Sequence, residues 1–191
     1  DRCLSRGLGD VYKRQTEYRT ETEKLLFSLP IAGSAFRKVY FDPSMGRPCA
    51  MFVPAEDFVV SYGASDLTTC ERATHVMKKT SNEIRKLQVS GFYSDIDLPA
   101  PSPDISEIQQ KYDRLTGDSE NYEFDNRHTL LEMHVDIDLI GFEDTDKGKP
   151  TGIALPYVVT IDKSSRTILS IRRNWYEDDP KKMKRDHYVH Y

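Results

Sequence analysis

Long hydrophobic runs and cysteine are both scarce in this sequence. The longest apolar stretch, residues 25–36, is 12 residues long and contains Pro30 and Gly33. It falls well short of the roughly 20 apolar residues that a membrane-spanning helix needs. The three cysteines are widely spaced and form no CxxC motif, which argues against a disulfide scaffold and a zinc knuckle. We therefore expect no membrane association, and synthesis in a reducing cytoplasm.

Charge is abundant and unevenly distributed. The 191 residues are 38% hydrophobic and 30% charged, with a net charge of -4 and a mean hydropathy of -0.63. Residues 95–146 contain 15 acidic and 3 basic residues, whereas residues 163–191 contain 8 basic and 4 acidic ones. This polarity suits subunits that meet acidic face to basic face, or a protein with one face toward DNA. Two solvated surfaces are the alternative.

Composition divides the chain into four segments. Residues 1–15 resemble a translated adapter sequence, so we treat them as a non-native scar. Residues 16–93 are expected to form a helix followed by β structure. Residues 94–126 form a Pro-rich acidic insertion with one helix, because the run of prolines at 99, 101 and 103 suits neither a helix nor a central strand. Residues 127–191 are expected to form an antiparallel β meander, truncated at its C-terminus.

The periodicity predicts an α+β fold, mainly an antiparallel β meander with a few amphipathic helices. One helix should end before Pro30, with Leu25, Leu26 and Leu29 on its apolar stripe. Another should be capped by Thr80 or Ser81. The expected helices are residues 17–29, 81–89 and 106–115. The expected strands are residues 36–41, 49–53, 58–60, 73–78, 129–142, 155–161, 167–175 and 187–191.

The strand at 129–142 alternates between apolar and polar residues. Its apolar face should be the buried one, leaving a polar face that presents Glu132, His134, Asp136 and Asp138. Metal sites use such carboxylate and imidazole groups. They need ligands that converge from several elements, however, and no matching cluster stands elsewhere in the sequence. No metal site is predicted.

Three other patterns contain residue types found in catalytic or binding sites, but they lack the contacts or the spacing that such sites need. Cys70 and His75 offer a nucleophile and a base, but their spacing does not show a contact or an orienting third group. Gly148-Lys149-Pro150-Thr151 lacks the spacing of a phosphate loop. His187 and His190 point to opposite faces of a strand. We expect no catalytic residues and no cofactor, and the binding residues stay unassigned.

The basic residues near the C-terminus form a candidate phosphate-binding surface. They are interleaved with Trp175 and Tyr176 and interrupted by the acidic triplet 177–179. Because of that interruption, a loop that engages an acidic neighbouring subunit is an equally good reading. The residues are Arg172, Arg173, Lys181, Lys182, Lys184 and Arg185.

Several short segments, in order along the chain, resemble the portal proteins of short-tailed bacteriophages. The resemblance covers everything after the N-terminal scar, and the acidic stretch at residues 95–125 is the part that matches least well. The segments are AFRKVYFDP (35–43), VPAEDFVV (53–60), YGASDL (62–67), RATH (72–75), LPYVVTID (155–162) and ILSIRRNWY (168–176).

The resemblance implies a ring of identical subunits, usually a dodecamer, at one vertex of the viral capsid. Double-stranded DNA passes through such a ring without sequence specificity during packaging and ejection. The terminase, capsid proteins and tail adaptors are the expected partners, and the virion the expected location. The family has no catalytic residues of its own, and the matching region would belong to the outward wing, ahead of the stem and clip. The alternatives are a metal-dependent hydrolase built on His134, Asp136 and Asp138, or a nucleic-acid-binding module built on residues 181–185.

Overall fold

A computed structural model describes residues 16–42, 46–101, 126–146 and 149–191. The helices are α2 (Thr16–Ala32) and α3 (Ser81–Val89), with a short 3-10 turn, η1 (Ala55–Asp57). The strands are β1 (Ala35–Asp42), β2 (Arg47–Pro54), β3 (Phe58–Val60), β4 (Arg72–Thr80), β5 (Arg127–Ile137), β6 (Thr145–Asp146), β7 (Lys149–Pro150), β8 (Leu155–Asp162), β9 (Ile168–Arg173) and β10 (Tyr188–His190).

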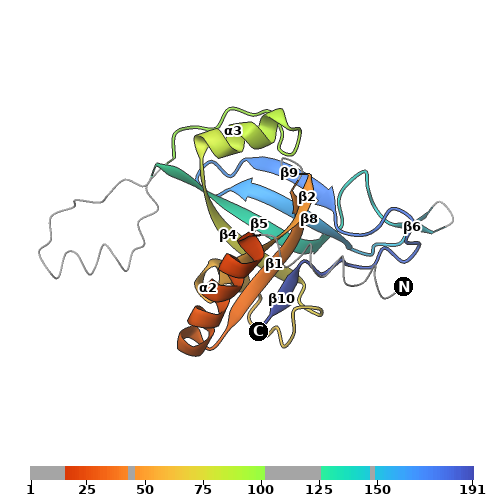
Figure 1. The fold of residues 1–191 in the computed structure, drawn as a ribbon. Coiled ribbons are helices and arrows are strands. Elements are labelled where there is room, and N and C mark those ends of the chain that lie inside the picture. Colours follow the sequence, from red (N-terminus) through yellow and green to blue (C-terminus); the bar gives the residue numbers. More distant parts are fainter. Residues whose placement is uncertain (1–15, 43–45, 102–125, 147–148) are drawn as a thin grey trace, which may run out of the picture.

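The strands form antiparallel sheets, as expected for an α+β fold dominated by β structure (Figure 1). The larger sheet has the order β3-β4-β5-β8-β9, and the smaller has the order β10-β1-β2. A separate two-stranded ribbon consists of β6 and β7. The last strand, β10, does not continue the meander after β9. It pairs with β1, so the first and last strands of the described chain lie side by side in the smaller sheet.

The two sheets face each other, and part of the layer between them is apolar. Val53 of the smaller sheet packs against Phe58 and Ala73 of the larger one. Alternate residues of β1 point the other way, and there Arg37 lies over the ring of Tyr18 in α2. The helix α2 therefore covers the outer face of the smaller sheet, giving three layers at this end of the molecule.

The helix α3 covers the other end of the larger sheet. Its Ile84 packs with Leu130 of β5 and Leu169 of β9 in a second apolar cluster. Thr80 caps the helix: its hydroxyl accepts from the Glu83 N–H, and the Glu83 carboxylate accepts from the Thr80 N–H. This capping box selects Thr80 over Ser81 and fixes where the strand becomes a helix.

The expectation for the first helix was wrong in two details. Pro30 lies inside α2, which continues to Ala32 and ends at Gly33, where φ is +72°. Proline has no N–H to give to Leu26, but one missing bond so near the end is tolerated because the last turn is loosely held anyway. Leu26 is not on the packed stripe; it is exposed, and Leu25 is the buried residue.

The faces of β5 also differ from the prediction. The side that carries Glu132 and His134 is the buried one, and the side that carries Leu131 and Met133 is only half-buried. Glu132 can be buried because the smaller sheet supplies a lysine opposite it. Both faces of the strand are packed, since Met133 lies against a third apolar cluster of Leu155, Tyr157 and Val159.

β5 ends earlier than expected. The strand stops at Ile137, not 142, because the N–H of Phe142 bonds to the carbonyl of Leu139 in a turn that places Gly141 at φ +87°. The helix expected at 106–115 lies outside the described residues.

Within the described parts of the chain, neither helix is long and apolar enough to cross a bilayer.

Candidate functional site

A polar cluster occupies the space between the two sheets, and Glu132 is its centre. The Lys38 ammonium lies 2.7 Å from Glu132 Oε2 and 2.5 Å from Oε1. The Tyr188 hydroxyl donates to Oε1 at 3.0 Å, and His134 Nε2 lies 3.2 Å from the same oxygen. We call these four residues, together with His75 and His187, the inter-sheet cluster.

The electrostatics of the inter-sheet cluster keep Glu132 ionised. Burial alone would raise the pKa of its carboxyl, but the Lys38 ammonium and the hydrogen bond with His134 outweigh burial and hold that pKa well below its usual range. Burial, reinforced by the charge of Glu132, raises the pKa of Tyr188. Tyr188 therefore stays a phenol that donates to the carboxylate.

The two histidines at the edge of the cluster are held neutral. Burial lowers the pKa of His75 to about 4, and repulsion from Lys38 adds to the effect. Burial also lowers the pKa of His187, whose Nε2 lies 2.9 Å from Asn174 Oδ1. Lys38, His75, Glu132 and His134 are buried, whereas His187 and Tyr188 are half-buried, and His75 Nδ1 is a buried atom without a hydrogen-bond partner. The cluster therefore links the two sheets through buried polar contacts.

The polar face predicted for β5 splits into two parts. Glu132 and His134 belong to the inter-sheet cluster, whereas Asp136 and Asp138 lie at the exposed end of the strand. Among the residues that the structure describes, no three His, Cys, Asp or Glu side chains converge as a metal ion would require.

The pairing suggested for Cys70 and His75 does not form. The Cys70 thiol lies 2.9 Å from the carbonyl of Arg72, while His75 faces the ring of Tyr188. His187 and His190 also have separate partners. His190 stacks on Phe36, and its Nε2 is 2.8 Å from Ser34 Oγ.

The basic residues are largely engaged within the chain. Lys182 forms an ion pair with Asp144, and the Lys184 ammonium donates to the carbonyl of Cys70 at 2.9 Å. Arg185 lies over Tyr176, and Arg172 over Phe92, with centroid distances of 4.4 and 3.7 Å. The acidic partner of Lys182 is thus in the same chain, which reduces the positive charge available to a phosphate backbone.

The residues expected to resemble a phosphate loop belong to a hairpin. Lys149 and Pro150 form β7, paired with β6. The Thr151 hydroxyl donates to the Asp144 carboxylate at 2.8 Å. Gly148 lies outside the described residues.

A second polar group lies beneath the first turn of α3, and sequence reasoning missed it. Ser81 Oγ is 3.1 Å from His128 Nε2, and His128 Nδ1 is 3.6 Å from Asp162 Oδ1. His128 is 3% exposed and Asp162 0%. These residues come from α3, β5 and β8, separated by 47 and 34 positions, so no local spacing signals the group.

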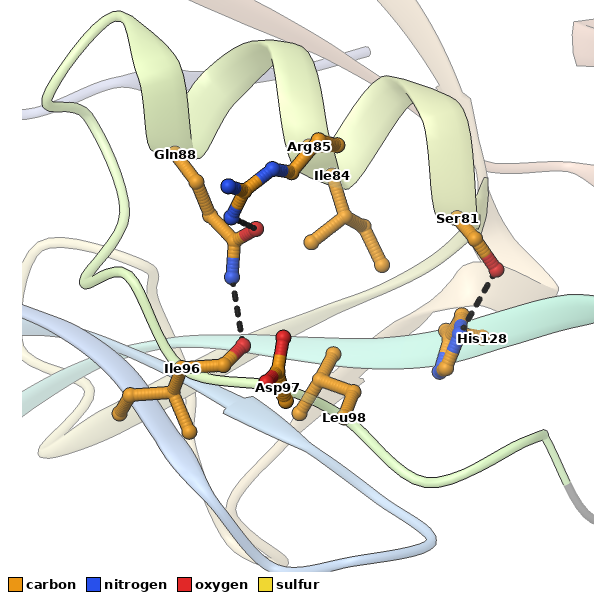
Figure 2. A pocket seen from close by; sticks show the side chains of 8 residues that line it. All are labelled: Ser81, Ile84, Arg85, Gln88, Ile96, Asp97, Leu98 and His128. Carbon is orange, nitrogen blue, oxygen red and sulfur yellow. Dashed lines mark hydrogen bonds between the residues drawn. The ribbon is translucent and has the colours of Figure 1, made fainter.

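This group borders a cavity of about 230 Å³ between α3 and the segment 96–98 (Figure 2). The Gln88 amide donates to the carbonyl of Ile96 at 2.7 Å and so holds one wall in place. The lining residues are Ser81, Ile84, Arg85, Gln88, Ile96, Asp97, Leu98 and His128.

No protein-family model and no curated protein matches the chain.

Proposed function

We propose that the chain is a structural subunit of a phage portal ring, through which genomic DNA is packaged and ejected and to which terminase and tail factors dock. Its place would be the capsid vertex of the virion. The resemblance of segments 35–43, 53–60, 155–162 and 168–176 to short-tailed-phage portals motivates this proposal.

The observation that carries the proposal is an apolar surface on α2. Leu26, Phe27 and Ile31 are 62%, 77% and 78% exposed and share the side of the helix that faces away from the smaller sheet. Contiguous exposed apolar surface of this kind marks a site of protein contact. We call these three residues the α2 surface.

A second apolar surface lies on the connection between β5 and β8. Its members, Ile140, Phe142 and Ile153, are also mostly exposed. Both ends of the connection lie beside the β6-β7 ribbon, where the Thr151 N–H donates to the Asp144 carbonyl at 2.8 Å. We call these three residues the β6-β7 surface.

The helix α2 and the β6-β7 ribbon, which carry or adjoin these residues, lie on opposite sides of the molecule (Figure 1). A head-to-tail ring needs two different complementary surfaces on each subunit, whereas a two-fold dimer needs one surface that contacts itself. The α2 surface of one subunit and the β6-β7 surface of the next meet this requirement.

The state of the basic residues is consistent with a DNA channel. A portal has to let DNA slide, and tight phosphate binding would stall it. Lys182, Lys184 and Arg185 are occupied by Asp144, the Cys70 carbonyl and Tyr176, respectively. A dedicated nucleic-acid-binding module would present such groups freely.

The test uses two single variants and their mixture. Phe27→Asp removes the α2 surface, and Phe142→Asp removes the β6-β7 surface. In sedimentation, the wild-type chain should form higher oligomers as its concentration rises, and each variant alone should stay monomeric. The mixture should stop at one-to-one dimers, because each variant retains one intact surface. Val89→Asp, at an exposed apolar residue of α3 outside both surfaces, should assemble like the wild type.

Monomers at every concentration, or assembly unaffected by either substitution, would contradict the proposal. Dimers of Phe27→Asp alone would indicate a two-fold contact instead of a ring.

A further inference from the structure

The position of Ser81 in the fold resembles that of a nucleophile at a strand-to-helix turn. β4 runs directly into α3, and Ser81 is the first residue of the helix. Its side chain is exposed and reaches down to the imidazole of His128 (Figure 2). A serine hydroxyl is nucleophilic only when a base takes its proton, and His128 Nε2 is within reach to do so.

The tautomer of His128 follows from what faces each of its nitrogens. Nδ1 faces Asp162 Oδ1 at 3.6 Å, and neither atom has another hydrogen-bond partner. A carboxylate only accepts, so the ring proton belongs on Nδ1, which leaves Nε2 free to accept from Ser81. A distance of 3.6 Å is long for a hydrogen bond, but such contacts commonly tighten only when substrate binds.

Asp162 is held rigidly enough to orient the histidine. Its other oxygen, Oδ2, accepts from the hydroxyls of Ser164 and Ser165 and from the N–H of Ser165, at 2.6–2.8 Å. Burial would raise the pKa of Asp162, but these hydrogen bonds lower it, so the carboxylate is ionised.

The first turn of α3 also provides donors for a developing oxyanion. The N–H groups of the first helical residues have no acceptor inside their own helix, and here they belong to Ser81 and Asn82. The N–H of Glu83 is already bonded to Thr80. Donors that follow the nucleophile on a helix are the usual source of oxyanion stabilisation at such turns.

We infer that Ser81, His128 and Asp162 form a serine-hydrolase-type centre that acts on short-chain carboxylic esters bound in the adjoining cavity. Ser81 and His128 are the catalytic residues, and Asp162 is a positioning residue. The cavity of about 230 Å³ limits the acyl group to a short one, and Ile84, Ile96 and Leu98 give it apolar walls.

The reaction needs only the ester and water. Ser81 Oγ bonds to the carbonyl carbon as its proton passes to His128 Nε2. The bond to the leaving alkoxide breaks, and His128 returns the proton to that oxygen, releasing an alcohol. Water, deprotonated by the same nitrogen, then attacks the acyl-serine, and the proton passes to Ser81 Oγ as a carboxylic acid leaves.

The first test uses an alkyl fluorophosphonate, which labels activated serines, and p-nitrophenyl acetate as the substrate. The wild-type chain should be labelled on the peptide that contains Ser81 and should hydrolyse the ester. Ser81→Ala should abolish labelling and reduce hydrolysis about 100-fold, the lower range for loss of such catalysis. Ser81 is exposed, so this variant should keep its far-UV circular dichroism. Ser90→Ala, at the other end of α3, should be labelled and active like the wild type.

The second test addresses Asp162. In Asp162→Asn, the amide donates to His128 Nδ1 and moves the ring proton to Nε2, where it blocks the base. Labelling of Ser81 should fall at neutral pH and recover as pH rises, because hydroxide replaces the histidine as base. A structural role alone would not produce that pH profile.

A folded wild-type chain that resists millimolar fluorophosphonate would overturn the inference. So would labelling spread equally over several serines, or hydrolysis that Ser81→Ala leaves unchanged.

Discussion

The Lys38 ammonium lies 2.7 Å from a carboxylate oxygen of Glu132, and both side chains are buried between the two sheets. Lys38 is on β1 and Glu132 is on β5, 94 positions away. The pair therefore joins the smaller sheet to the larger one at a defined register.

Removing one partner of this ion pair should destabilise the protein strongly. Lys38→Met leaves the Glu132 carboxylate buried without its cation, which typically costs about 3–5 kcal/mol. Urea unfolding followed by circular dichroism measures the loss. Lys181→Met, at an exposed lysine, should change stability by less than about 0.5 kcal/mol. Equal effects of the two substitutions would argue against a linking role for the pair.

Acid should weaken the folded state through His75. The folded protein holds the pKa of His75 at about 4, against 6.5 for the free side chain, because burial and Lys38 disfavour the imidazolium. Between these values the unfolded chain binds the proton more readily, so stability present above pH 6.5 is lost as pH falls toward 4. The full shift corresponds to about 3 kcal/mol. His187 adds to the loss in the same direction.

The measurement for this prediction is the urea midpoint at several pH values between 4 and 7.5. His75→Gln should flatten the dependence, because the titrating group is gone. His190→Gln should leave it unchanged, because that residue is exposed and lies outside the inter-sheet cluster. A steep dependence that persists in His75→Gln would assign the effect to other groups.

The two faces of β5 should respond differently to truncation. Leu130 is fully buried against Ile84 and Leu169, whereas Leu131 is half-buried. Leu130→Ala should cost about 2–5 kcal/mol, and Leu131→Ala should cost less because fewer of its atoms leave water. Chemical denaturation of the two variants compares them directly. A larger cost for Leu131→Ala would instead indicate that the face of β5 carrying Leu131 forms the main core.

The cap of α3 should contribute measurably to stability. Thr80→Ala removes the hydroxyl that accepts from the Glu83 N–H, a change that typically costs about 1 kcal/mol. Asn82→Ala, in the exposed first turn, is the matched control and should cost less. The unfolding free energies of the two variants decide the question, and equal values would remove the special role of Thr80.

Local signals predicted much of the fold. Period-two alternation located most of the strands, since a strand buries alternate side chains whatever it pairs with, but it overran the end of β5 and did not predict β6 and β7. The capping pattern at Thr80 acts over three residues, so it is legible in the sequence. The wrong end of α2 came from treating Pro30 as an absolute stop, although a helix can lose one bond in its last turn.

The sequence by itself determined the α+β class and the antiparallel pairing of neighbouring strands, and it placed the start of α3 to within one residue, because those depend on contacts between residues close in the chain. Tertiary structure alone decided which face of β5 is buried, since a carboxylate enters the interior only where a distant Lys38 compensates its charge. It likewise decided that β10 pairs with β1, and that Ser81, His128 and Asp162 meet. Those juxtapositions depend on how three separate elements pack, and packing acts between residues that the sequence keeps far apart.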